Sequence, residues 1–317
     1  MPPPTEAQTG YQAGFHRRWH WLHDRHVRDL AWLLDAPNLL DAAAPRWQGR
    51  IASLPQADEA TRTWLGAQDQ SPHALHEFLD IQPFTRLGRY AEKLLAWYLQ
   101  HRDDLYAHGV QVRAGQGETI GEFDFLLRRG DALVHWEFAT KLYLLESGGH
   151  GRHADYFVGP GLADTLGAKV RKIMEQQLAL SAHPAARLPL PVVQAQALVK
   201  GWLFYEECTP ECPPGIATGH CRGFWRPLAH VAALRADAFM VLPRLRWLAP
   251  ARVEEGDAVF PDAGALAANL GALFGASSAP VLVALLRREG ADLLEADRGF
   301  IVPDDWRERA AARREAP

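Results

Sequence analysis

The sequence has few cysteines, no long apolar run and no excess of positive charge. Its 317 residues include three Cys, and 34 Lys and Arg stand against 38 Asp and Glu, for a net charge of −4. No apolar run approaches about 18 residues, so we expect no transmembrane helix. The acidic balance argues against a protein that coats nucleic acid, although it is compatible with a nuclease, whose own carboxylates attract a metal ion.

The N-terminal segment also lacks a targeting signal. MPPPTEAQTG has no basic region followed by an apolar one, so it does not resemble a signal peptide, and we expect a cytoplasmic protein. With 48% hydrophobic residues, the chain can nevertheless bury a large core.

The three cysteines lie close together near one histidine, which is a possible zinc set. These residues are Cys208, Cys212, His220 and Cys221. Their spacing lacks the usual C-x2-C knuckle, and adjacent His and Cys side chains point apart in an extended chain. We therefore favour free thiols in a loop and keep zinc as the alternative.

The most informative feature is a pair of strand-like runs that carry acidic residues inside apolar sequence. The first run covers residues 121–127, and the turn at 128–131 leads into the second, which predicts a hairpin. Strand alternation places one set of side chains on one face: Glu122, Asp124 and Leu126. It places another set on the opposite face: Phe123, Phe125 and Leu127.

The second run has the same two-sided character. One face is expected to carry His135, Glu137, Ala139 and Lys141. The opposite, apolar face is expected to carry Val134, Trp136 and Phe138. If the two acidic faces coincide, Asp124 and Glu137 lie side by side near an ammonium group. Two hard oxygen donors beside a lysine are the minimal set for Mg²⁺-assisted phosphodiester hydrolysis.

This pattern resembles the PD-(D/E)XK nuclease superfamily, in which an acidic strand is followed by a short turn and an E-x-K strand. The resemblance extends upstream to Glu92 on an expected helix at 86–100, followed by a strand at 110–112 and then the G-E-x-D of residues 121–124. It implies that Asp124, Glu137 and Glu92 hold Mg²⁺ or Mn²⁺, and that the partner is nucleic acid, with DNA favoured.

The chain is also similar to an uncharacterised bacterial group, domain-of-unknown-function family 1853. The similarity is carried by VRDLAW, GEFDFLL, HWEFATKLYL, KVRKIMEQQLAL and KGWL, which are spread over most of residues 27–250. Family likeness of this kind implies a fold more directly than it implies an activity.

One position departs from the nuclease pattern. Ala139 occupies the usual lysine position, and the next lysine, Lys141, is displaced by roughly 6.6 Å at the rise of a strand. A migrated Lys141 would orient or deprotonate the attacking water. The alternatives are an inactive binding module that kept the fold, and a scaffold protein with exposed Trp residues as contacts.

Three further residues are secondary candidates for the site. Glu122 lies on the expected face of Asp124. Lys169 and Gln176 are seven residues apart on an expected helix at 161–182, so both would lie on one helical face. The resemblance implies that the helix after the E-x-K strand carries a Lys or Gln near the metal.

We therefore predict an α/β fold, with a restriction-endonuclease-like mixed sheet flanked by helices and a helical N-terminal region. The predicted organisation is a helical region at 1–83, a nuclease-like core at 84–250 and a C-terminal helical segment at 251–317, with helices at 263–275 and 279–288. Within the core, a strand is expected at 192–205. The sequence leaves the oligomeric state open.

Overall fold

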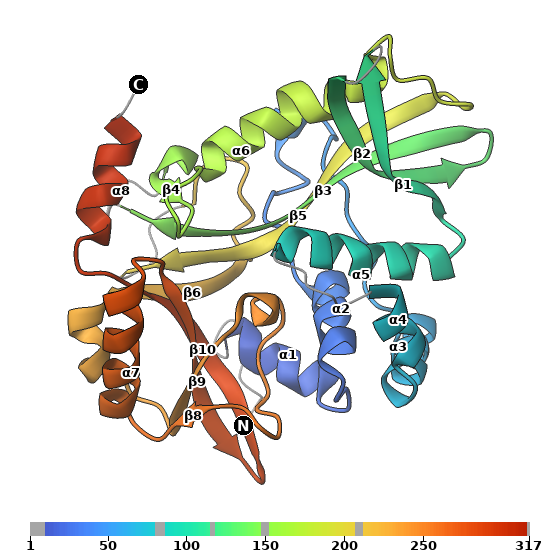
Figure 1. Cartoon of the computed structure of the whole chain (residues 1–317). Coiled ribbons are helices and arrows are strands. Elements are labelled where there is room, and N and C mark those ends of the chain that lie inside the picture. The colour runs from blue at the N-terminus through green and yellow to red at the C-terminus, as the bar shows by residue number, and fades with distance from the viewer. Residues whose placement is uncertain (1–9, 80–85, 115–117, 147–151, 207–211, 316–317) are drawn as a thin grey trace.

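The computed structural model describes residues 10–79, 86–114, 118–146, 152–206 and 212–315. The chain is a mixed α/β protein built on a ten-stranded sheet with helices on both faces (Figure 1). The strand order is β1-β2-β3-β5-β6-β10-β9-β7-β8, with the short β4 beside β3. None of the helices in the described ranges is long and apolar enough to cross a membrane.

The helices fall into three groups along the chain. The N-terminal region contains α1 (Tyr11–Trp19), α2 (Arg25–Asp35), the 3₁₀ turn η1 (Pro45–Trp47), α3 (Glu59–Gln70) and α4 (His73–Leu79). The middle of the chain contains α5 (Leu87–His101) and α6 (Leu166–Lys172). The C-terminal part contains α7 (Ala263–Ala276) and α8 (Trp306–Glu315).

The strands change from antiparallel to parallel and back across the sheet. An antiparallel meander is formed by β1 (Leu105–Ala114), β2 (Glu118–Arg129) and β3 (Ala132–Leu145). Parallel pairs continue through β5 (Val192–Tyr205), β6 (Cys221–Pro227) and β10 (Asp292–Val302). Antiparallel pairs end the sheet with β9 (Val281–Glu289), β7 (Ala238–Val241) and β8 (Val259–Phe260), while β4 (Phe157–Val158) is antiparallel to β3.

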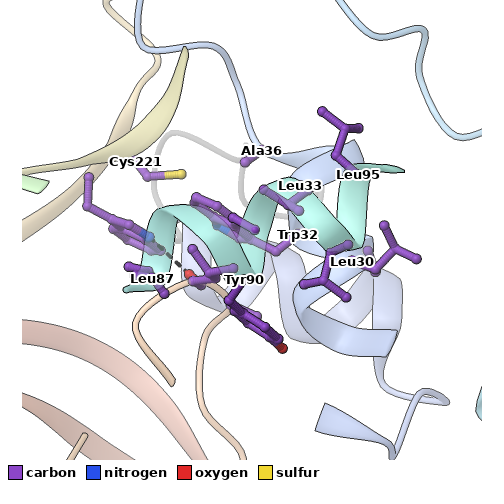
Figure 2. Packing of buried hydrophobic residues seen from close by; sticks show 14 of the residues in the cluster. Leu30, Trp32, Leu33, Ala36, Leu87, Tyr90, Leu95 and Cys221 are labelled. Atoms are coloured by element: carbon purple, nitrogen blue, oxygen red, sulfur yellow. Dashed lines mark hydrogen bonds between the residues drawn. The ribbon is translucent and has the colours of Figure 1, made fainter. Parts of the chain in front are cut away.

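One face of the sheet is covered by α5 and α2, because their apolar stripes meet in the main core. The α5 residues Leu87 and Tyr90 belong to the same buried cluster as Phe138 of β3. Figure 2 shows this packing from close by, with Trp32 of α2 beside α5 and the Cys221 thiol of β6 near them. The helix that carries Glu92 is thus held against the sheet along its apolar side.

The other face of the same strands is covered by α6. Leu166 and Val170 of α6 share a second buried cluster with Ala139 of β3 and Val199 of β5. The two helices therefore lie on opposite faces of the central strands (Figure 1).

Several sequence predictions are confirmed. The hairpin turns at Gly130, whose φ of 61° favours glycine. The strand predicted at 192–205 is β5, with the same bounds, and the helix predicted at 86–100 is α5, shifted by one residue.

The prediction of a helix at 279–288 is wrong. Residues 281–289 form β9, which pairs with β10, so the segment 251–317 is not helical throughout and contributes strands to the common sheet. A short apolar run such as VLVALL fits a buried strand as well as a buried helix, and periodicity alone does not separate them.

A buried ion pair fastens the C-terminal strands to the preceding loop. Glu295 and Arg298 of β10 have fully buried side chains 2.5 Å apart. Arg298 donates to the carbonyl oxygens of Trp247 and Ala249, and Glu295 accepts the backbone N–H of Ala251. The pair therefore satisfies backbone groups that would otherwise be buried without partners.

Glu295→Ala should lower the free energy of unfolding by about 3–5 kcal/mol, because it leaves the Arg298 guanidinium buried without its carboxylate. Urea denaturation measures the change. The matched control is Glu289→Ala, which removes a half-exposed partner of Arg287 and should cost less than about 0.5 kcal/mol. Equal losses in the two variants would contradict this account of the pair.

Candidate metal and catalytic site

The candidate site lies where β2 and β3 separate. The ladder between them runs from the pair Arg129–Ala132 to the pair Phe125–Trp136, and in the described chain it ends there. Just beyond that point, Asp124 Oδ2 accepts the backbone N–H of Phe138 at 2.8 Å. The carboxylate therefore takes the place of the next ladder bond, which explains why an acidic residue is tolerated inside an apolar strand.

The predicted alternation of β2 does not hold across this point. Phe123 packs with Leu126 in one buried cluster, whereas Phe125 and Leu127 pack in the main core. The change of side falls where β2 leaves β3, near Asp124. In β3, by contrast, the three residues predicted on one face share one cluster, as expected: Val134, Trp136 and Phe138.

Three of the predicted acidic residues meet in this opening. One carboxylate oxygen from each of Glu92, Glu122 and Asp124 lies within 4.8 Å of the others. All three side chains are half-buried, and Glu92 comes from α5 while the other two come from β2. Glu122, a secondary candidate in the sequence, is thus a full member of the group.

The fourth predicted acid, Glu137, lies next to this group rather than within it. Its residue is only 2% exposed, and its charge interacts with that of Asp124. Its Oε2 atom is buried and accepts no hydrogen bond from the described residues, while the protonated carboxyl can donate one to Asp124. For the ionised carboxylate, a buried oxygen that accepts no hydrogen bond is costly unless another ligand supplies a partner.

The lysine beside Glu137 is Lys169, not Lys141. Lys169 Nζ of α6 lies 4.0 Å from Glu137 Oε1. Lys141 Nζ instead forms an ion pair with Asp164 Oδ2 at 3.1 Å, and Tyr143 donates its hydroxyl to the same oxygen at 3.0 Å. The structure therefore brings Lys169 into the site and directs Lys141 to a neighbouring acid.

The second residue at Glu137 is Gln177, one position after the predicted Gln176. Gln177 donates its amide to Glu137 Oε1 and accepts a hydrogen bond from Lys169 at 2.9 Å, while Gln176 is exposed. The cause is a π-helical turn at Ile173–Gln177, directly after α6. A π turn adds one residue, so the residue aligned with Lys169 is the eighth rather than the seventh along. Such turns are frequent at functional sites.

The titration behaviour of the site reflects crowded, buried charges. The pKa of Glu92 is raised to about 7 and that of Glu137 to about 9, mainly by burial and secondly by the charge of Asp124. Burial also raises the pKa of Asp124 to about 6. Burial lowers the pKa of Lys169 below its usual value. The isolated fold thus disfavours the charged form of all four groups, and strongly perturbed groups of this kind cluster at functional sites.

The donor set fits a hard divalent cation. Mg²⁺ and Mn²⁺ prefer carboxylate oxygen, and the three grouped carboxylates offer such atoms close together. The buried Glu137 Oε2 adds a fourth oxygen nearby. On these observations, the residues present fit the predicted metal.

The alternative zinc set has no such support. Cys208 lies outside the described residues. Of the others, His220 uses both ring nitrogens within the protein, with the Tyr205 hydroxyl and the Ala217 carbonyl as partners, and Cys212 Sγ is 4.0 Å from its Nδ1. The described cysteines and histidines therefore do not form a group of three metal ligands.

The chain belongs to the family described as a domain of unknown function (DUF1853), whose sequence model matches residues 28–302. No match was found among curated proteins or among solved structures. The family description carries no activity, and a fold alone does not fix a function.

Glu92→Gln should raise the Tm relative to the wild type at pH 8, by roughly 2–4 °C for a chain of this size. The folded-state pKa of Glu92 lies above that of the unfolded chain, so the fold binds this proton more tightly and loses stability as pH rises from about 4.5 to about 7. The gain should vanish at pH 4, where both states are protonated.

Circular dichroism melting curves in EDTA measure this dependence. The control is Glu175→Gln, an exposed carboxylate on the π turn, which should leave the Tm nearly unchanged at both pH values. A Glu92→Gln variant with the same loss of stability at pH 4 and pH 8 would show that the charge is not the cause.

Proposed function

We propose that this DUF1853 chain is a metal-dependent nuclease that hydrolyses phosphodiester bonds in nucleic acid, with DNA as the favoured substrate and the cytoplasm as its compartment. The observation that carries the proposal is the meeting of three carboxylates, Glu92, Glu122 and Asp124, beside a buried Glu137 and its partner Lys169. Carboxylates with an adjacent ammonium group supply both the metal ligands and the charge that phosphodiester hydrolysis needs.

The order of the structural elements supports a restriction-endonuclease-like core. The PD-(D/E)XK resemblance implies a helix with Glu92, a strand, the G-E-x-D strand, the E-x-K strand and a further helix. The chain has α5, β1, β2, β3 and α6 in this order, and β5 then returns parallel to β3. The two helices lie on opposite faces of the sheet, and both contribute side chains to the opening at Asp124.

Glu92, Glu122 and Asp124 would hold Mg²⁺ or Mn²⁺, with Glu137 within reach of the same space. A bound divalent ion would lower the pKa of a coordinated water and offset the charge of the phosphate group. The Phe138 N–H fixes the direction of Asp124, and the Gln177 amide fixes that of Glu137. Ligands held in this way need little rearrangement when the ion binds.

We assign to Lys169 the role that the sequence suggested for Lys141. Lys169 is held beside Glu137 by Gln177, and burial lowers its pKa below the usual value of a lysine. It would orient the attacking water or accept its proton, and it would offset the charge that develops on the phosphate. Lys141, paired with Asp164, contributes positive potential nearby.

A second candidate function is an inactive binding module with the same fold. The Lys169–Glu137 ion pair favours it, because such a pair can take the place of a metal ion. The scaffold alternative loses its basis, since the large hydrophobic side chains exposed in the described chain are Tyr106, Val193 and Leu273, and none of the tryptophans is among them.

Asp124→Asn should abolish Mn²⁺ binding in calorimetric titration and reduce cleavage of plasmid or single-stranded DNA by at least about 100-fold, because Asp124 belongs to the ligand group and orders its neighbours. Glu175→Gln serves as the matched surface control. A wild type that is folded by circular dichroism yet binds no Mn²⁺ and cleaves nothing would support the binding module instead.

Lys169→Met and Lys141→Met separate the two lysine assignments. Lys169→Met should lower kcat by about 100-fold or more and leave Mn²⁺ binding intact, because it removes the group that acts on the water. Lys141→Met should change kcat by less than about fivefold, since only a nearby charge is lost. The opposite order of effects in single-turnover cleavage would return the catalytic role to Lys141.

A further inference from the structure

A second candidate site lies on the outer side of α6, away from the carboxylates. A pocket of about 290 Å³ is formed by η1, residues 152–155, α6 and residues 213–216. Gly167 and Arg171 line it, and each is two positions from Lys169, so they lie roughly 200° around the helix axis from that lysine. The pocket is therefore separate from the candidate metal site, although both use α6.

The floor of this pocket is apolar. Trp47, Val170 and Ile216 line it, and each is at most 8% exposed as a residue. The Trp47 indole is fixed because its Nε1 donates to the Gly215 carbonyl at 2.9 Å. The Arg46 guanidinium already lies over the Trp47 ring, so the floor offers the ring of a ligand apolar contact rather than an open stacking face.

The rim of the pocket is positively charged. Three arginines, Arg46, Arg152 and Arg171, line it against a single acid, Asp155. The whole chain has a net charge of −4, so this local excess of positive charge is opposite in sign to the rest of the molecule. A concentration of arginines at the mouth of a small cavity favours an anionic group, and phosphate suits their geometry.

Two of these arginines are held in place by bonds that use only some of their N–H groups. Arg46 Nη1 donates to the Pro214 carbonyl at 2.6 Å, and the Arg46 guanidinium lies 4.6 Å from the centre of the Trp47 ring. Arg171 binds both carboxylate oxygens of Asp155, at 2.9 and 3.1 Å. A guanidinium has five N–H donors, so the bonds seen in the described chain leave each arginine with donors for a ligand.

Two glycines allow the walls to approach as closely as they do. Gly215 has a φ of +84°, and a Cβ atom there would lie 2.5 Å from the Trp47 ring. A Cβ atom at Gly167 would lie 2.2 Å from the Asp155 carboxylate. Any larger residue would displace Trp47 or Asp155, so the shape of the pocket depends on both glycines.

We propose that this pocket binds a single nucleotide, with its base over the apolar floor and its phosphate at the arginine rim. A sugar phosphate would not use the apolar floor, and an apolar ligand would not use the positive rim. The volume lies at the lower end of ligand pockets, roughly 300–1,000 Å³, which restricts the occupant to about one nucleotide unit. The nucleotide is either free or the 5′-phosphorylated end of a nucleic-acid strand.

Calorimetric titration of the full chain tests the proposal. EDTA is present throughout, so that no divalent ion at the candidate metal site contributes to nucleotide binding. Each 5′-mononucleotide is compared with its nucleoside and with inorganic phosphate, and a short 5′-phosphorylated oligonucleotide is compared with its 5′-hydroxyl form. At least one phosphorylated nucleotide should bind at least tenfold more tightly than its nucleoside and than inorganic phosphate, because only it uses both floor and rim. Preference for the mononucleotide or for the strand end identifies the source.

Substitutions in the pocket test whether the nucleotide binds there. Arg46→Gln should weaken it about tenfold or more by removing a charged donor, and Ala154→Trp should block it by filling the pocket. Arg235→Gln, an exposed arginine elsewhere, and Asp124→Asn should bind as the wild type does. Absence of nucleotide binding at millimolar concentration, equal binding of inorganic phosphate, or unchanged binding by both pocket variants would overturn the proposal.

Discussion

The hydrogen bond from the Phe138 N–H to the Asp124 carboxylate is the contact on which the candidate site depends. It lies where β2 and β3 stop pairing, and it replaces the next ladder bond with a side chain. The Phe138 N–H of β3 therefore keeps a hydrogen-bond partner where the two strands separate. Through this opening Glu92 and Glu122 reach Asp124 from one side, and Lys169 reaches Glu137 from the other.

The opening gathers four acidic side chains, Glu92, Glu122, Asp124 and Glu137, beside Lys169, and burial disfavours the ionised form of three of these acids. Burial raises the pKa values of Glu92, Asp124 and Glu137, and Lys169 is the described cation paired with Glu137. Such an arrangement lowers the stability of the isolated fold at neutral pH, which is typical of functional sites and uncommon in purely structural ones. A bound divalent cation would favour the ionised carboxylates and so offset this loss of stability.

The sequence was sufficient for the parts of the site that depend on local pattern. The acids at 122, 124 and 137 stand out because carboxylates interrupt apolar strands, and the hairpin and β5 follow from turn residues and alternation. Lys169 was among the secondary candidates, but Gln177 required the structure, because the π turn at 173–177 shifts the helical register by one residue. The change of faces near Asp124 and the strand β9 also depend on tertiary pairing, which periodicity does not encode.

The most direct measurement is anomalous diffraction from crystals grown with Mn²⁺. The account predicts one strong peak among the carboxylates of Glu92, Glu122 and Asp124, with metal–oxygen distances of about 2.0–2.2 Å. The contrary result is a set of well-diffracting crystals, grown with the same Mn²⁺, that show no peak there and keep Lys169 paired to Glu137. This result would contradict a metal-dependent site and leave the inactive binding module as the better description of this chain.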